Sequence, residues 1–139
     1  RGGTLFIERE RKRDALRVVQ QVATALQAGA AVAVFPEGTT GAGTQLLPFH
    51  ANLLQAAITS GALLQPVALR YGDAVSRFSP AVVWIGETSL AESVWQIVCA
   101  DSLQVCVTLL PALPSAAGER RLLAEALRSR IQAALDAAD

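Results

Sequence analysis

The segment 35–43, with the sequence FPEGTTGAG, holds the residue types in this chain that are best suited to binding chemistry. It follows the apolar run 30–34, and Pro36 should end a strand there because proline fixes φ and lacks an amide donor. The three glycines of the segment allow the backbone to turn tightly and to approach a ligand closely. Glu37 adds a carboxylate, and two threonines add hydroxyls. The pattern therefore predicts a ligand-binding loop at the end of a buried strand.

The elements around this loop follow from hydrophobic periodicity. A helix over 10–28 is predicted by apolar side chains three and four positions apart, and Gly29 should end it. The run 31–35 is continuously apolar, which suits a strand covered on both faces. The alternation of strands and helices indicates an α/β fold, a mostly parallel sheet flanked by helices, in a single domain over 1–139. The other predicted elements are helices at 51–60, 90–100 and 119–137, and strands at 4–7, 64–71, 81–85 and 103–110.

Strand 4–7, helix 10–28 and strand 31–35 would form a βαβ unit, in which the two strands are parallel and joined by a right-handed crossover. Both carboxyl ends then lie at one edge of the sheet, where open α/β sheets bind ligands. Arg9 and Glu37 each follow one of these strands. We therefore expect the two side chains to share a pocket, in which the guanidinium of Arg9 suits a phosphate.

Each of these two side chains also has a structural interpretation. Arg9 would make a surface ion pair with Glu8 or Asp14, which contributes little to stability. Glu37 would accept hydrogen bonds from backbone N–H groups and so hold the loop in shape. The sequence leaves these alternatives open.

Composition excludes several classes of protein. The 139 residues carry twelve basic and twelve acidic side chains, so nothing indicates a general nucleic-acid binder. A hydrophobic fraction of 52% argues for a packed chain and against disorder. No apolar stretch is long enough to span a membrane, and no signal peptide is visible. Cys99 and Cys106 lie in apolar surroundings without metal-ligand spacing, which indicates buried free thiols and no metal site.

Two further groups of residues allow a membrane role. The basic run 11–13 would meet anionic headgroups, although three charges are too few to anchor a protein. Trp84, Trp95 and Phe78 would pack in the core or face a membrane.

Three motifs resemble a known family. GTLFIER (3–9) resembles the second conserved block of the glycerolipid acyltransferases, FPEGTT (35–40) the third, and QPVALRY (65–71) the fourth. Their order and spacing agree with that family over about residues 1–72. The third block is specific, and the three in order identify the chain as similar to 1-acyl-sn-glycerol-3-phosphate acyltransferases.

The resemblance implies an N-terminally truncated glycerolipid acyltransferase-like domain. It implies acyl transfer from acyl-CoA or acyl-carrier protein to the hydroxyl of a lysophospholipid, at the cytoplasmic face of the membrane. Neither a metal nor a bound cofactor is expected, and the acyl thioester is a cosubstrate. Arg9, Glu37, Gly38 and Thr39 fall in the family's acceptor-binding segments.

The family's first block, Asn-His-x-x-x-x-Asp, is missing from this sequence. In the family its His is the general base for the acceptor hydroxyl, and its Asp orients the imidazole. The single histidine of this chain, His50, has Gln55 five residues later and is expected only to begin a helix. We therefore predict no catalytic residue in this chain, which looks like a piece of a longer protein and should be inactive alone.

A second departure from the family concerns Thr40, which stands where many members carry Arg. It removes a cation from the loop and favours other acceptors, such as lyso-ornithine lipid. Two alternatives remain beside the enzyme. One is a non-catalytic lipid- or partner-binding domain on the same fold. The other is an unrelated nucleotide-binding α/β protein, for which the glycine-rich phosphate signatures are lacking.

Overall fold

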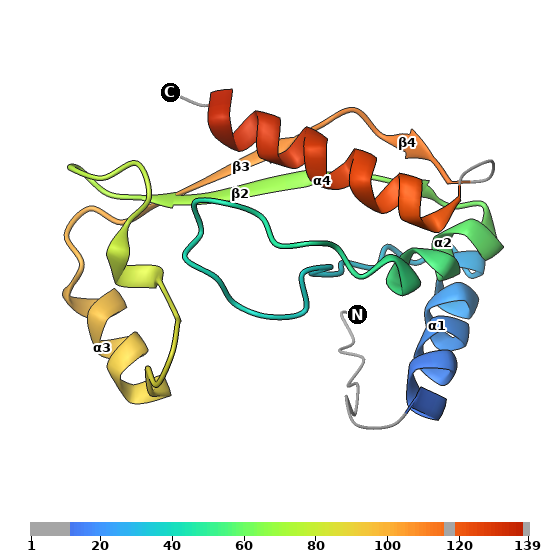
Figure 1. Cartoon of the computed structure of the whole chain (residues 1–139), viewed down its shortest axis with the longest axis horizontal. Coiled ribbons are helices and arrows are strands. Elements are labelled where there is room, and N and C mark those ends of the chain that lie inside the picture. The colour runs from blue at the N-terminus through green and yellow to red at the C-terminus, as the bar shows by residue number, and fades with distance from the viewer. Residues whose placement is uncertain (1–11, 116–118, 138–139) are drawn as a thin grey trace. The chain divides into compact units, whose positions relative to one another are not determined.

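The computed structural model describes residues 12–115 and 119–137, which contain helices and two short antiparallel strand pairs (Figure 1). The predicted strand 4–7 lies outside the described residues. The described residues form two compact units, one of 12–36, 50–64, 112–115 and 119–124, and one of 37–49, 65–111 and 125–137. The prediction of a single domain stays a prediction.

The elements in chain order are α1 (Lys12–Gln27), η1 (Ala51–Leu54), α2 (Gln55–Ser60), β1 (Leu63–Leu64), β2 (Val67–Gly72), η2 (Pro80–Val82), α3 (Leu90–Cys99), β3 (Gln104–Leu109), β4 (Leu113–Pro114) and α4 (Arg120–Ala137), where η denotes a 3₁₀ helix.

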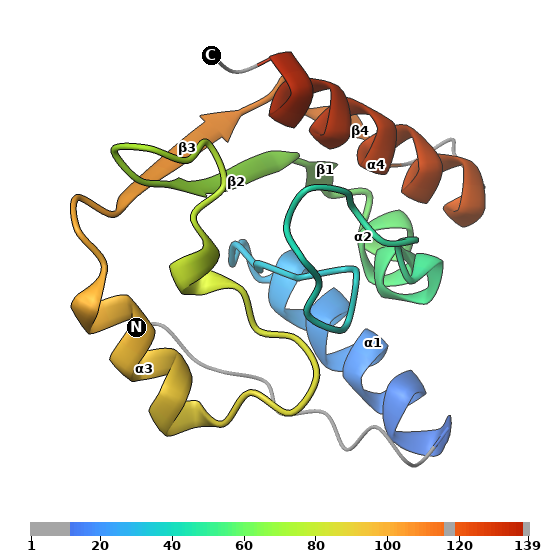
Figure 2. The same ribbon diagram turned by 60° about the vertical axis from the view of Figure 1, so that its left-hand side comes forward.

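In the first unit, α1 packs against α2 (Figure 2). Val18 and Ala23 of α1 are buried, as are Ala56 and Ala57 of α2. The predicted end of the first helix is confirmed, because Gly29 has a positive φ of 82°, a conformation that glycine adopts without a steric penalty. Helix 51–60 is confirmed as η1 followed by α2.

Ser115 connects the end of α2 to the segment after β4. Its side chain is fully buried, and its hydroxyl lies 2.8 Å from the carbonyl oxygen of Ala57 and 2.6 Å from that of Ala62. The Ala57 carbonyl also accepts the N–H groups of Gly61 and Ala62, so the hydroxyl adds to the hydrogen bonds that close the carboxyl end of α2. The short pair β1–β4 lies next to this contact, with Leu63 opposite Pro114.

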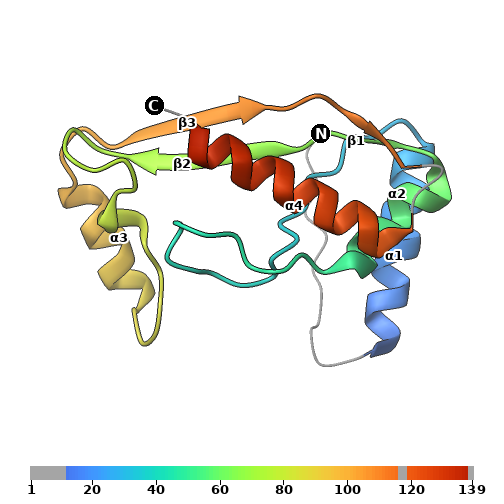
Figure 3. The ribbon, with the colours of Figure 1, turned by 45° about the horizontal axis from the view of Figure 1, so that its top comes forward.

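The second unit is built on the antiparallel pair β2–β3, which runs as a twisted ribbon (Figure 3). Val67 pairs with Leu109 at one end and Gly72 with Gln104 at the other. The chain between the two strands contains η2 and α3, which pack against each other. The predicted helices 90–100 and 119–137 are confirmed as α3 and α4, and the predicted strands 64–71 and 103–110 correspond to β2 and β3 within a few residues.

The prediction of a mostly parallel sheet was wrong for the described residues, in which both strand pairs are antiparallel. The α/β class itself holds, since helices and strands both occur along the described chain. The error came from the expected pairing of strand 4–7 with strand 31–35. Residues 31–35 form no strand in the structure, so the predicted βαβ unit has no second strand.

Two apolar runs that suggested strands are irregular instead. In the run 31–35, Phe35 is 77% exposed, and no neighbouring strand pairs with this backbone among the described residues. An apolar composition alone does not supply the hydrogen-bond partners that a strand needs. The run 81–85 begins inside η2, where Ser79 accepts a hydrogen bond from the N–H of Ala81 and Pro80 removes a ladder donor.

One face of the β2–β3 ribbon is apolar and exposed. Side chains paired across the ribbon lie on the same face of the sheet, and the facing pairs on this side are apolar. On the opposite face Ala68 is only 3% exposed. The exposed pairs are Val67 with Leu109, Leu69 with Val107, and Tyr71 with Val105.

The aromatic residues divide between two environments. Trp95 on α3 is 69% exposed, so it does not pack in the core of the described structure. Phe78 is half-buried, and the guanidinium carbon of Arg77 lies 5.6 Å from the centre of its ring. None of the helices in the described part of the chain is long and apolar enough to cross a membrane.

The Ser115 contact predicts a loss of stability on substitution. Ser115→Ala removes the hydroxyl that donates to the carbonyl oxygens of Ala57 and Ala62, which should lower the free energy of unfolding by about 1 kcal/mol. Urea denaturation measures this change. Ser129→Ala is the control, because Ser129 is exposed on α4 and its side chain makes no hydrogen bond to described residues. Equal unfolding midpoints for S115A and the wild type would contradict the contact.

The turn after β2 predicts a pH effect. Hydrogen bonds from the Ser79 side chain, the Ser76 amide and the Val75 amide lower the pKa of Asp73 below its ordinary value of 3.8. The ionised carboxylate therefore stabilises the folded state at higher pH, and this stabilisation is lost as the pH falls through the lowered pKa.

Asp73→Asn should consequently flatten the decline of the urea midpoint below about pH 4. Glu87→Gln, at an exposed site without hydrogen bonds to described residues, should leave the decline as it is in the wild type. If the urea midpoints of D73N and the wild type fell equally with decreasing pH, Asp73 would not contribute to the pH dependence of stability.

Candidate functional site

The loop 37–49 connects Pro36 to His50 without helix or strand (Figures 1 and 2). Its two flanking residues are joined by a hydrogen bond of 2.8 Å from the N–H of His50 to the carbonyl oxygen of Pro36. Gly38 and Gly43 have φ values of 67° and 80°, which residues with a Cβ atom rarely adopt. The prediction of a glycine-dependent turning loop is confirmed, although no strand precedes it.

Glu37 connects the beginning of the loop to the segment near its end. Its Oε2 atom accepts a hydrogen bond of 2.8 Å from the backbone N–H of Leu47, ten residues along the chain. This contact supports the structural interpretation of Glu37. The other carboxylate oxygen makes no hydrogen bond to a described residue, so the side chain can lock the loop and still accept a hydrogen bond from a ligand.

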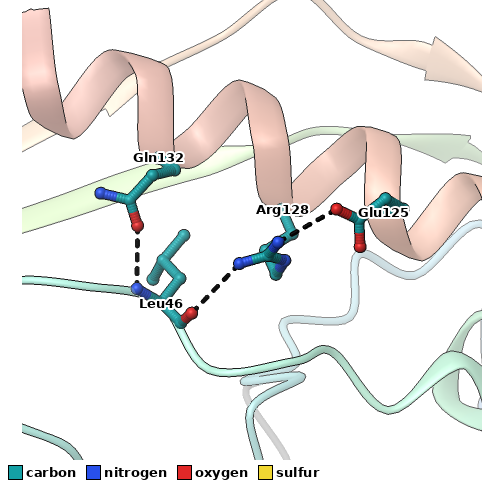
Figure 4. Close-up of polar contacts among 4 residues, drawn as sticks. All are labelled: Leu46, Glu125, Arg128 and Gln132. Atoms are coloured by element: carbon teal, nitrogen blue, oxygen red, sulfur yellow. Dashed lines mark hydrogen bonds and ion pairs between the residues drawn. The ribbon is translucent and has the colours of Figure 1, made fainter.

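Side chains of α4 hold the loop at Leu46 (Figure 4). Oε1 of Gln132 accepts a hydrogen bond of 2.8 Å from the N–H of Leu46, and Nη1 of Arg128 donates one of 3.3 Å to the carbonyl oxygen of Leu46. Both backbone polar groups of Leu46 are thus satisfied by one helix. Such groups in an irregular loop otherwise depend on water.

Two carboxylates orient these α4 side chains. Glu125 accepts a hydrogen bond of 3.0 Å from Nη2 of Arg128, and this contact raises the pKa of Arg128 above its ordinary value. Asp136 accepts one of 2.9 Å from Nε2 of Gln132, which leaves the Oε1 atom of Gln132 facing Leu46. Arg128 and Gln132 were not predicted from the sequence, because charged and amide residues at helical spacing are typical of any solvated helix face.

The loop and α4 border an open groove of about 370 Å³, lined by polar and charged groups together with one leucine. This geometry suits a small polar or charged group held near the surface. Its lining residues are Thr44, Gln45, Leu46, Arg128, Gln132 and Asp136.

The predicted site residues have different outcomes. Arg9 lies outside the described residues, so its expected pairing with Glu37 stays a prediction. Gly38 and Thr39 lie in the loop beside Glu37, and Thr39 is exposed. His50 is the N-cap residue directly before η1, as predicted for a helix-start residue.

The two cysteines differ from the prediction in one respect. Cys99 and Cys106 are free thiols, but both are exposed rather than buried. Cys99 ends α3, whose apolar side chains face outward, and Cys106 lies on the ribbon strand β3. In the described part of the chain, no three His, Cys, Asp or Glu side chains are grouped so that they could hold a metal ion.

Comparisons with known proteins agree with the motifs around this loop. Residues 1–70, half of the chain, match the family described as Acyltransferase. The chain is 35% identical to a 1-acyl-sn-glycerol-3-phosphate acyltransferase of Neisseria gonorrhoeae, over 97% of this chain and 51% of that protein. No solved structure shows a significant match.

Other relatives carry a different name. The chain is 33% identical to a lyso-ornithine lipid O-acyltransferase of Brucella abortus, over 97% of this chain and 55% of that protein. It is 32% identical to one of Pseudomonas aeruginosa, over 97% and 52% respectively. The chain therefore spans about half the length of these relatives.

The Glu37 contact predicts a local change in loop order. Glu37→Ala should expose the Leu47 amide to solvent and speed its hydrogen exchange by roughly tenfold, because one hydrogen bond to a charged acceptor is lost. Glu37→Gln keeps an acceptor and should change the exchange much less. Amide exchange followed by NMR measures both variants. An unchanged exchange rate of the Leu47 amide in E37A would show that Glu37 does not stabilise the loop.

Proposed function

Because the chain belongs to the Acyltransferase family, we propose that the protein transfers a fatty acyl group from an acyl thioester to the hydroxyl of a lysolipid in lipid biosynthesis. The observation that carries this proposal is the family match over residues 1–70, which includes the loop held by Glu37. The donor is acyl-CoA or acyl-carrier protein, and no metal or bound cofactor takes part. Peripheral contact with the cytoplasmic face of a membrane, where lysolipids lie, belongs to the same proposal.

The proposed reaction is a direct attack of the acceptor hydroxyl oxygen on the thioester carbonyl carbon. The new C–O ester bond forms, the C–S bond breaks, the thiol of the donor leaves, and a general base takes the hydroxyl proton. The chain has no base suited to this step, since its only histidine begins η1 and has no carboxylate at the family's spacing. The base therefore comes from an Asn-His-x-x-x-x-Asp segment outside these 139 residues.

The role of this chain is to bind the acceptor. Arg9 pairs with an anionic group of the acceptor, and the unoccupied oxygen of Glu37 accepts a hydrogen bond from one of its polar hydrogens. The exposed hydroxyl of Thr39 and the backbone at Gly38 add further hydrogen bonds. The acceptor that fits this set best is a lysophospholipid such as 1-acylglycerol-3-phosphate.

A second acceptor is favoured by Thr40. This position carries no cation, so the loop has less positive charge to offer a phosphate. Ornithine carries an amino group, which would pair with the Glu37 carboxylate rather than with a guanidinium. Lyso-ornithine lipid is therefore the alternative acceptor, in line with the names of the Brucella and Pseudomonas relatives. A non-catalytic lipid-binding domain on the same fold is the alternative to an enzyme.

The test uses the protein expressed from its complete coding sequence. Acyl-CoA or acyl-carrier protein is supplied with lysophosphatidate or with lyso-ornithine lipid, and ester formation is measured. Turnover with one acceptor is expected, and Arg9→Ala should raise the KM for a phosphate acceptor roughly 10–100-fold because a charge-assisted hydrogen bond is lost. A wild-type KM in R9A would contradict the assigned role of Arg9.

Two Glu37 variants separate charge from loop support in the same assay. Glu37→Gln retains the acceptor for the Leu47 amide but loses the negative charge, so a rise in acceptor KM for E37Q indicates direct contact with the acceptor. Binding of a lysolipid without turnover, in a protein lacking the His-Asp segment, would identify the non-catalytic alternative. Absence of both turnover and binding would refute the proposal.

A further inference from the structure

The peptide group between Leu46 and Leu47 is held at both of its polar ends. Its carbonyl oxygen, on Leu46, accepts a hydrogen bond from Arg128, and its N–H, on Leu47, donates to the carboxylate of Glu37. The peptide group is planar and trans, so these two ends form one rigid unit. A displacement of the carbonyl oxygen therefore also moves the N–H that holds Glu37.

The charges at the two ends reinforce each other. A guanidinium withdraws electron density from the carbonyl oxygen, which makes the N–H of the same peptide group a stronger donor to the carboxylate. Gln132 holds the preceding peptide group, because its Oε1 atom accepts a hydrogen bond from the N–H of Leu46. Arg128 and Gln132 are one helical turn apart on α4, so one helix face aligns both contacts (Figure 4).

We propose that Arg128 and Gln132 are positioning residues for the acceptor site, which fix the backbone of Leu46 and through it the Leu47 N–H that holds the carboxylate of Glu37. The inference rests on the proposed function for the identity of the ligand. Neither residue needs to touch the acceptor. Both act through the backbone of Leu46, and Glu37 is the group that meets the ligand.

The variants that test this inference are chosen in matched pairs. Gln132→Met keeps the length of the side chain but removes the acceptor for Leu46, and Ser129→Ala, at an exposed position of the same helix, is its control. Arg128→Ala removes the donor to Leu46, and Arg130→Ala is its control. Arg130 is exposed on the same helix, and its side chain makes no hydrogen bond or ion pair with described residues.

The first measurement is hydrogen exchange of the Leu47 amide in the complete protein, which needs no substrate. Exchange should accelerate roughly three- to tenfold in Q132M and R128A, as for the loss of one hydrogen bond, and should stay within about twofold of the wild type in S129A and R130A. An unchanged Leu47 rate in both Q132M and R128A would overturn the inference.

The second measurement is steady-state kinetics with the better lysolipid acceptor. Q132M and R128A should raise the acceptor KM roughly three- to tenfold, with kcat and the donor KM within about twofold, and S129A and R130A should keep the acceptor KM within about twofold of the wild type. Equal losses in acceptor KM, donor KM and kcat, together with a lower unfolding midpoint, would indicate general destabilisation and overturn the inference. Accelerated Leu47 exchange in Q132M and R128A, in a protein whose wild type transfers no acyl group, would refute the proposed function and leave the coupling to Glu37 standing.

Discussion

The hydrogen bonds from side chains to the backbone of Leu46 and Leu47 are the interactions on which the candidate site depends. The loop 37–49 has no helix or strand to satisfy its backbone, and buried or half-buried polar groups without partners are costly. Glu37, Arg128 and Gln132 provide those partners from side chains. A loop rich in glycine loses much conformational freedom when it is ordered, so these contacts offset an entropy cost that the loop sequence itself imposes.

The two compact units have small cores compared with their exposed apolar surface. The buried apolar side chains include several alanines, while the ribbon β2–β3 and helix α3 expose large apolar side chains. Cross-strand pairs such as Leu69 with Val107 contribute only about 0.2–1 kcal/mol each, and an isolated two-stranded ribbon is marginally stable in water. The stability of the second unit therefore depends on side-chain contacts outside the ladder, such as the hydrogen bond from Arg77 to the carbonyl of Leu135 on α4.

The family relationship and the geometry concern the same few residues. The match to the Acyltransferase family covers residues 1–70, and the loop that follows Phe35 has in this structure a fixed carboxylate, exposed hydroxyls and two glycines with positive φ. Thr40 makes the loop less cationic than the family pattern, and the relatives likewise divide between a phosphate-bearing and an ornithine-bearing acceptor. The proposed division of labour, with acceptor binding in this chain and the base elsewhere, agrees with a chain that spans about half of its relatives.

The sequence by itself determined the helices α1 to α4, the end of α1 at Gly29, the glycine-dependent loop and the family, because periodicity, positive φ and short motifs are local properties. It did not determine how strands pair: the run 31–35 has strand composition but no partner among the described residues, and β2 and β3 are antiparallel. It also did not reveal Arg128 and Gln132, which lie 82 and 86 residues from Leu46. Only the folded chain brings one face of α4 to the backbone of Leu46. A hydrogen bond depends on distance in space, so residues far apart in the sequence form it without any periodic pattern that would predict it.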